Sequence, residues 1–178
     1  MADIYVSNLS QLQSAIAAAA GGETIILRNG SYGDLDILGE SFSKYVTIKA
    51  ETPLGAKFNS ISVENSSFIS IAGVHVDNPS NSGQSLVFIN ESKNISFTNS
   101  EVNGKVDTVY PITGPSFGIY VYGDSAGIRL ENNNVHDVQN GVVTFGASNV
   151  TIVGNTIDRI GEDAFKFSNV NGGVIADN

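Results

Sequence analysis

The sequence contains no cysteine, few cations and no long apolar run. Without cysteine there is neither a disulfide framework nor a thiolate metal site. Nine Lys and Arg face 18 Asp and Glu, and the net charge of −9 gives no basic footprint for nucleic acid. An acidic surface also repels polyanions such as alginate or pectate, unless Ca²⁺ or a local basic cluster intervenes. No apolar stretch is long enough for a membrane span, and no signal-peptide pattern opens the chain.

A short apolar motif recurs along the chain, most clearly at residues 150–157, with related copies at 69–76, 95–102 and 128–135. The third residues of successive copies are separated by 23, 26, 33, 22 and 23 positions. A base period of this kind with two enlarged members indicates a repeat architecture. The residues that define the period are Ile48, Ile71, Phe97, Leu130, Ile152 and Ile175.

Each copy has apolar residues two apart, which is the period of a strand with one buried face. A second apolar run precedes each copy, through Val63, Ile89, Tyr122, Phe145 and Phe167. Two short strands per repeat, separated by Asn, Ser and Gly, predict a parallel β-helix, and we call each of its coils a rung. We therefore expect a single all-β solenoid domain over residues 1–178.

An Asn column accompanies the repeat, formed by Asn133, Asn155 and Asn178, with Ser100 in register. Asn tolerates the left-handed backbone of a tight turn, and we expect these residues to adopt it. Stacked Asn side chains can also hydrogen-bond from rung to rung, as they do in cross-β ladders.

The N-terminal segment predicts a short strand at 4–6 and then a helix. Asn8 and Gln11 have the spacing of a capping box, and apolar residues follow at helical intervals at Leu12, Ile16 and Ala19. We expect a helical cap over about 8–20 and rungs from about 23 to 178. The two enlarged repeats place insertions at 77–84 and 103–116, and such insertions are often binding loops.

The C-terminal residues Asp177 and Asn178 fall in the middle of a rung. An uncapped strand edge promotes association. We therefore expect this edge to be continued, or covered by a partner protein or a second copy of the chain.

Residues 3–27, followed by Asn29-Gly-Ser-Tyr32, resemble the opening of polysaccharide lyase family six, within the pectate-lyase-like right-handed β-helix superfamily. The later rungs are similar to those of mannuronan epimerases and phage spikes. The resemblance implies a right-handed parallel β-helix with one N-terminal capping helix. It leaves the function open, because lyases, hydrolases, epimerases and spikes share such rungs.

Lyase or epimerase chemistry needs a base and a cation beside the uronate carboxylate. Family-six lyases place a Lys and an Arg on successive rungs, and this resemblance makes Lys166 and Arg159 the catalytic candidates. The Asp-Pro-His-Glu stretch of alginate epimerases is missing here, and His136-Asp137 is the nearest counterpart. Lys166 alternates with Phe165 and Phe167, so a solvent-facing strand residue is the alternative interpretation.

Residues 161–163 resemble the Gly-Asp-Asp-Cys motif of polygalacturonases, where paired carboxylates act as acid and base or nucleophile. Here Glu162 and Asp163 hold that position, but the acid expected one rung earlier falls near Asn140. The alternative is that these two residues serve only in the turn before the strand, where such residues are common.

No cofactor is expected, although Ca²⁺ is possible. His136, Asp137, Asp158, Glu162 and Asp163 fall on neighbouring rungs, where their oxygens could hold Ca²⁺, and a solvated turn surface is the alternative. The alternation places both histidines, His75 and His136, on the outward face.

Aromatic residues give a further signal. Residues 117–122 read Phe-Gly-Ile-Tyr-Val-Tyr and follow the longer insertion. Aromatic faces pack against sugar rings. Tyr120 is assigned to the opposite side of its strand from Tyr122, and core packing is the alternative role. The candidate binding residues are Tyr110, Tyr120, Lys105 and Asp107.

From these observations we expect a polysaccharide-recognition module that works outside the cell, on a cell surface or on a virion. A lyase or epimerase acting on uronate polymers is the first alternative. A structural spike that assembles through its open C-terminal edge is the second.

Overall fold

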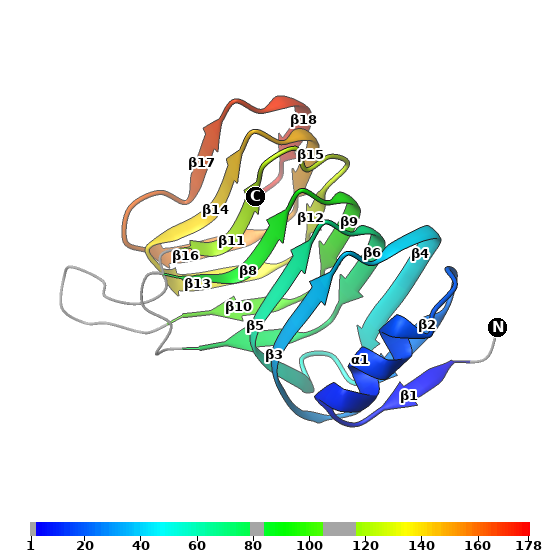
Figure 1. The fold of residues 1–178 in the computed structure, drawn as a ribbon. Coiled ribbons are helices and arrows are strands. Elements are labelled where there is room, and N and C mark those ends of the chain that lie inside the picture. The colour runs from blue at the N-terminus through cyan, green and yellow to red at the C-terminus, as the bar shows by residue number, and fades with distance from the viewer. Residues whose placement is uncertain (1–2, 79–83, 105–116) are drawn as a thin grey trace.

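The computed structural model describes residues 3–78, 84–104 and 117–178. The chain coils as a right-handed β-solenoid whose strands pair in parallel with strands of the neighbouring rungs (Figure 1). One sheet has eight strands, in the order β1 (Ile4–Val6), β2 (Thr24–Leu27), β4 (Ser41–Ala50), β6 (Ser67–Ala72), β9 (Lys93–Thr98), β12 (Arg129–Glu131), β15 (Ser148–Val153) and β18 (Asn171–Ala176). We call this sheet face 1.

The second sheet bends around the solenoid and forms two faces, because both wings share β5 (Ala56–Glu64). The first half of β5 pairs with β7, while its second half pairs with β8. Face 2 comprises this first half and the first half of β3 (Gly30–Leu38), with β7 (His75–Asp77), β10 (Glu101–Asn103), β13 (Asn134–Val138) and β16 (Thr156–Ile160). Face 3 comprises the second halves of β3 and β5, with β8 (Ser85–Asn90), β11 (Phe117–Tyr122), β14 (Asn140–Phe145) and β17 (Phe165–Ser168).

The predicted repeat is confirmed by the register of face 1. Each residue that defines the period is paired with its counterpart on the next rung, from Ile48 to Ile175. Five of these six side chains are at most 1% exposed, and Ile175 on the last rung is the exception at 53%. The core is thus a stack of apolar rows, which explains why the period is visible in the sequence.

The second predicted column is correct at Val63, Ile89 and Phe167 and wrong at Tyr122 and Phe145. Ile89 pairs with Val121, whereas Tyr122 pairs with Asn90 and Phe145. Val121 is fully buried, and Tyr122 and Phe145 are each 40% exposed. Side chains alternate along a strand, so a prediction that is off by one position places both aromatics in the interior, although they lie on the surface.

The Asn column forms the predicted rung-to-rung bonds. The Oδ1 atom of Asn133 accepts from the Ser100 N–H at 3.0 Å, and that of Asn155 accepts from the Asn133 N–H at 2.9 Å. Asn178 caps Asn155 in the same way. The left-handed backbone, however, belongs to the residue before each of these positions, at Asn99, Asn132, Gly154 and Asp177. The predicted left-handed position was therefore one residue too late.

Helix α1 (Leu9–Ala17) packs on the first rung at the N-terminal end of the solenoid (Figure 1). The Asn8 side chain accepts from the Gln11 N–H, as the capping-box spacing predicts. Leu12 and Ile16 are buried in the core, whereas Ala19 lies beyond the helix end and is only partly buried. Among the described residues, no helix is long and apolar enough for a transmembrane segment.

Strands β17 and β18 lie at the opposite end of the solenoid (Figure 1). They expose side chains at positions that other rungs bury. Phe167 is 39% exposed, Val174 54% and Ile175 53%. Whether another segment, a partner or a second copy covers this edge stays a prediction.

Candidate functional site

A groove of about 560 Å³ lies on the outer surface of face 3, over strands β3, β5, β8 and β11. Its central row consists of Asp36, Ser62, Phe88 and Tyr120, which are paired in register across these four strands. Their neighbours in each strand, such as Ile37 and Ile119, point into the core. The alternation that builds the core therefore also builds the groove.

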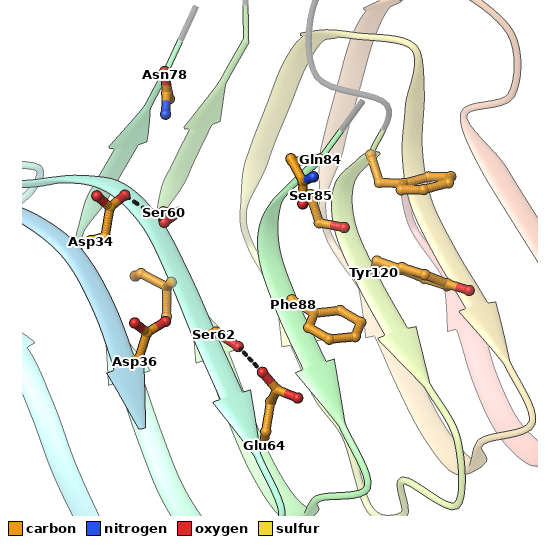
Figure 2. Close-up of a pocket in the computed structure, with 12 residues that line it drawn as sticks. Asp34, Asp36, Ser60, Ser62, Glu64, Asn78, Gln84, Ser85, Phe88 and Tyr120 are labelled. Carbon is orange, nitrogen blue, oxygen red and sulfur yellow. Dashed lines mark hydrogen bonds between the residues drawn. The ribbon is translucent and has the colours of Figure 1, made fainter. Parts of the chain in front are cut away.

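One side of the groove carries three carboxylates on β3 and β5, namely Asp34, Asp36 and Glu64 (Figure 2). The Ser60 hydroxyl donates to Asp34 at 2.7 Å, and the Ser62 hydroxyl donates to Glu64 at 2.9 Å. Asn90 also donates to Glu64, at 3.2 Å. These bonds hold two of the carboxylates in place.

Asp36 differs from its two neighbours. Its side chain is exposed and makes no hydrogen bond or ion pair with any residue that the structure describes. No Lys, Arg or His is among the described residues that line the groove. The carboxylate side is therefore negative, and Asp36 has acceptor oxygens available to a ligand.

The other side of the groove is aromatic, with Phe88 and Tyr120 on β8 and β11 (Figure 2). The Tyr120 ring centroid lies 5.7 Å from that of Phe88 and 4.8 Å from that of Phe117. The series continues beyond the groove, because Tyr120 contacts Tyr122 and Tyr122 stacks on Phe145, with centroids 5.6 Å apart in both pairs. Partial burial raises the pKa of the Tyr120 phenol above its ordinary value, and the phenol is uncharged at neutral pH.

The expectation that Tyr120 and Tyr122 face opposite sides is wrong. Residues two apart in a strand share a side, and the buried residue between them is Val121. Both tyrosines face outward, on the surface that carries the groove.

Residues of and next to the two insertions line the groove. Asn78 and Gln84 belong to the first insertion, and Phe117 directly follows the second. The candidate binding residues Lys105, Asp107 and Tyr110 lie outside the described residues. Of the four binding candidates, Tyr120 is the one that the structure places in the groove.

The catalytic candidates lie elsewhere. His136 was expected to face outward, but it is only 7% exposed. Its Nδ1 atom lies 2.6 Å from the Asp137 carboxylate and 2.7 Å from the Arg159 guanidinium, and its Nε2 atom lies 3.0 Å from Glu101. His136 pairs in register with Asn103 and with the exposed Asp158, on the opposite side of its strand from the core residue Val135. Its burial therefore comes from the polar side chains that cover it, and the alternation holds.

Arg159 is engaged by two carboxylates. Its guanidinium donates to both oxygens of Asp137, at 2.8 and 2.7 Å, and to Asp158 at 2.6 Å. The Arg159 hydrogen bonds lower the pKa of Asp137 despite its burial, and Asp137 in turn raises the pKa of Arg159. This cluster ties β13 to β16 as a network of ion pairs.

The remaining candidates have separate partners. Lys166 lies on β17 in the outward row of Tyr120 and Val143, with its Nζ atom 3.5 Å from Asp163. Glu162 accepts hydrogen bonds from Gln139 and Asn140. The proposed Ca²⁺ ligands Asp158, Glu162 and Asp163 are thus each held by a different group. In the described ranges, no cluster of three or more acidic or His side chains could hold a metal.

Sequence reasoning missed Asp34, Asp36, Glu64 and Phe88. Their signal was available, because extending the register of each strand to its polar positions aligns Asp36 with Tyr120 through Ser62 and Phe88.

Parallel strands in stacked rungs around an apolar core define a parallel β-helix. Residues 57–178 match the family described as "Right handed beta helix region". Since this match covers more than half of the chain, the protein belongs to that family. The superfamily resemblance is therefore confirmed at the level of the fold.

The solved structures that are similar to this chain include an alginate lyase and a phage tailspike. The alginate lyase from Paenibacillus sp. str. FPU-7 superposes with a TM-score of 0.57 at 14% identity, over 94% of this chain and 65% of that one. The enzymatically active domain of tailspike protein 2 from bacteriophage CBA120 gives a TM-score of 0.57 at 14% identity, over 97% of this chain and 30% of that one. At such identity the likeness concerns the fold alone. No curated protein matches the sequence significantly.

Proposed function

We propose that this chain is a carbohydrate-recognition module and that its polysaccharide ligand lies in the groove of face 3. The observation that carries the proposal is the pairing of an aromatic side with a side of hydrogen-bonding groups in one concave surface. Protein sites for small ligands are typically concave and largely apolar, with a few placed polar groups, and have volumes of roughly 300–1,000 Å³. The groove, at about 560 Å³, falls in this range.

Both sides match the chemistry of a sugar ring. The apolar face of a pyranose packs on an aromatic ring such as Tyr120 or Phe88, and this contact excludes water from both surfaces. The sugar hydroxyls then meet Asp36, Ser60 and Ser62 across the groove. Rings and acceptors stand on paired strands, so little conformational entropy is lost on binding.

The neighbouring structures support a carbohydrate ligand through the name of one of them, an alginate lyase. The chain spans 65% of the length of that enzyme and 30% of that of the tailspike, so any activity of the whole protein is part of the proposal. A polysaccharide ligand also fits a place of action outside the cell, on a cell surface or on a virion.

A lyase or epimerase acting on uronates is the second candidate, and Lys166 favours it because it lies in the same outward row as Tyr120. Against it, the Arg159 guanidinium is already bound by Asp137 and Asp158. Incubation with alginate and polygalacturonate, with and without Ca²⁺, distinguishes the two candidates through absorbance of the unsaturated product. Turnover by the wild type that disappears in Lys166→Ala would show that the chain is an enzyme and would contradict the recognition proposal.

A structural spike is the third candidate, favoured by the exposed apolar side chains of Val174 and Ile175 on the last rung. Its partner would be a second copy or another protein that continues the stack. Sedimentation of the wild type and of Ile175→Asp tests it, because a charge on this edge would dissociate such an assembly and leave a monomer unchanged.

The main test is a binding screen against immobilised polysaccharides with the wild type and Tyr120→Ala. We expect binding to weaken at least about tenfold, or ~1.4 kcal/mol, because the variant removes a ring from the aromatic side. Tyr5→Ala is the matched control, since Tyr5 is 52% exposed on β1 and does not line the groove. Far-UV circular dichroism confirms that both variants fold. Equal losses in both variants, or no binding to any polymer, would contradict the proposal.

A further inference from the structure

We infer that the groove selects a polysaccharide without acidic groups, whose hydroxyl or ammonium donors are bound by Asp34 and Asp36, and that it rejects polyuronates. This inference rests on the proposed function and names its ligand class. It departs from what the name of the alginate lyase suggests, because alginate is a polyuronate.

The charge of the groove gives the first argument. Asp34, Asp36 and Glu64 line it, and none of its other described lining residues is a cation to offset them. Asp34 and Glu64 are held by hydrogen bonds from Ser60, Ser62 and Asn90, so they cannot easily turn away from a ligand. A uronate lying on the aromatic side would bring its carboxylate close to fixed like charges, which is unfavourable in a partly desolvated site.

The second argument concerns the free acceptors. Asp36 is exposed, and its carboxylate has no polar partner within the described ranges. The second oxygen of Asp34 is also unused there, because Ser60 bonds only to Oδ1. An ionised carboxylate accepts through two oxygens and donates nothing. These positions therefore suit ligands that present hydroxyl or ammonium donors, and charge-assisted bonds of this kind are the stronger ones.

A bridging cation does not reverse this preference. Lys166, on β17, lies two strands beyond the last strand that lines the groove and is paired with Asp163. Within the part of the chain that the structure describes, the groove carboxylates do not form a cluster able to hold a metal. A uronate thus finds no positive group among the described residues that line the groove.

The test measures affinity of the intact chain for three ligand classes, namely neutral glucans and mannans, chitosan, and the polyuronates alginate and polygalacturonate. We expect binding to a member of the first two classes and at least tenfold weaker binding to the polyuronates. Asp36→Ala should weaken the preferred interaction about tenfold. Asp36→Lys should raise affinity for alginate by a similar factor, because it replaces repulsion with attraction.

Glu51 provides the matched controls. It is exposed in the segment between β4 and β5 and does not line the groove, so Glu51→Ala and Glu51→Lys change the net charge equally without changing the site. Asp36 is an exposed side chain without partners, so its variants should fold, and circular dichroism confirms this.

The outcomes separate the two claims. Tight wild-type binding to polyuronates would overturn the inference and leave the proposed carbohydrate function standing. Binding to neutral polymers that Asp36→Ala leaves unchanged, or an alginate gain as large in Glu51→Lys as in Asp36→Lys, would also overturn it. Binding to none of the three classes would contradict the proposed function itself.

Discussion

The Asn ladder gives a stability prediction whose size follows from its contacts. Asn133 is 2% exposed; its Oδ1 atom accepts from the Ser100 N–H, and its Nδ2 atom donates to the Phe97 carbonyl at 2.9 Å. Asn133→Ala leaves the Ser100 N–H buried without its acceptor and removes one donor from the Phe97 carbonyl, which also belongs to the parallel ladder of β9 with β12. An unsatisfied buried donor costs about 1–3 kcal/mol and a lost hydrogen bond about 0.5–1.5 kcal/mol, so we expect the free energy of unfolding to fall by about 1.5–4.5 kcal/mol.

A serine at this position should restore part of the loss. One rung earlier, the Ser100 hydroxyl accepts from the Val74 N–H at 3.1 Å and donates to the Thr98 carbonyl at 2.8 Å. In Asn133→Ser the hydroxyl can accept from the Ser100 N–H in the same way, so we expect roughly half the loss of Asn133→Ala. Asn134→Ala is the control, because Asn134 is the next residue, at the start of β13, and is exposed.

The assay is urea unfolding followed by far-UV circular dichroism. If Asn133→Ala and Asn133→Ser both stay within about 1 kcal/mol of the wild type, the ladder bonds contribute no net stability and the reasoning fails.

Two further predictions concern the core and the ion-pair network. Ile152→Ala should cost about 2–5 kcal/mol and Ile175→Ala less than about 1 kcal/mol by urea unfolding, because Ile152 is fully buried and Ile175 is 53% exposed; equal costs would mean that another surface covers the last rung. The Arg159 hydrogen bonds lower the pKa of folded Asp137, so the stability that this carboxylate provides is complete above its unfolded pKa of about 3.9 and is lost as the pH falls through the folded pKa. The stability difference between the wild type and Arg159→Gln, measured by urea unfolding across pH, should therefore be larger at about pH 6 than at about pH 2.5, and a constant difference would contradict it.

The sequence was sufficient to predict the solenoid because its core rows recur at nearly constant spacing. Ile48, Ile71 and Phe97 are adjacent in space for the same reason that they align in the sequence. The Asn8 cap was predictable because it involves only neighbouring residues. Such local and periodic features need no knowledge of the tertiary structure.

The site was harder to predict because it depends on the strand register of face 3. The sequence prediction assigned Tyr122 to the inward column in place of Val121, which put the register off by one position. It therefore missed the outward row that contains Phe88 and Tyr120. The burial of His136 depends on Glu101 and Arg159, which come from other rungs, 35 and 23 residues away in the sequence. No local sequence pattern predicts such a contact.

The parallel register of face 3 also gives the side chains on its outer surface a regular spacing along the solenoid axis. Adjacent strands lie about 4.8 Å apart, and rings on successive rungs follow this interval, with centroids 5.7 Å apart for Phe88 and Tyr120 and 5.6 Å for Tyr122 and Phe145. A polymer lying along the solenoid axis would meet one ring position per rung, so its affinity would rise stepwise with the length of the polymer. Deleting one whole rung would remove one ring position, while the remaining positions stayed in register.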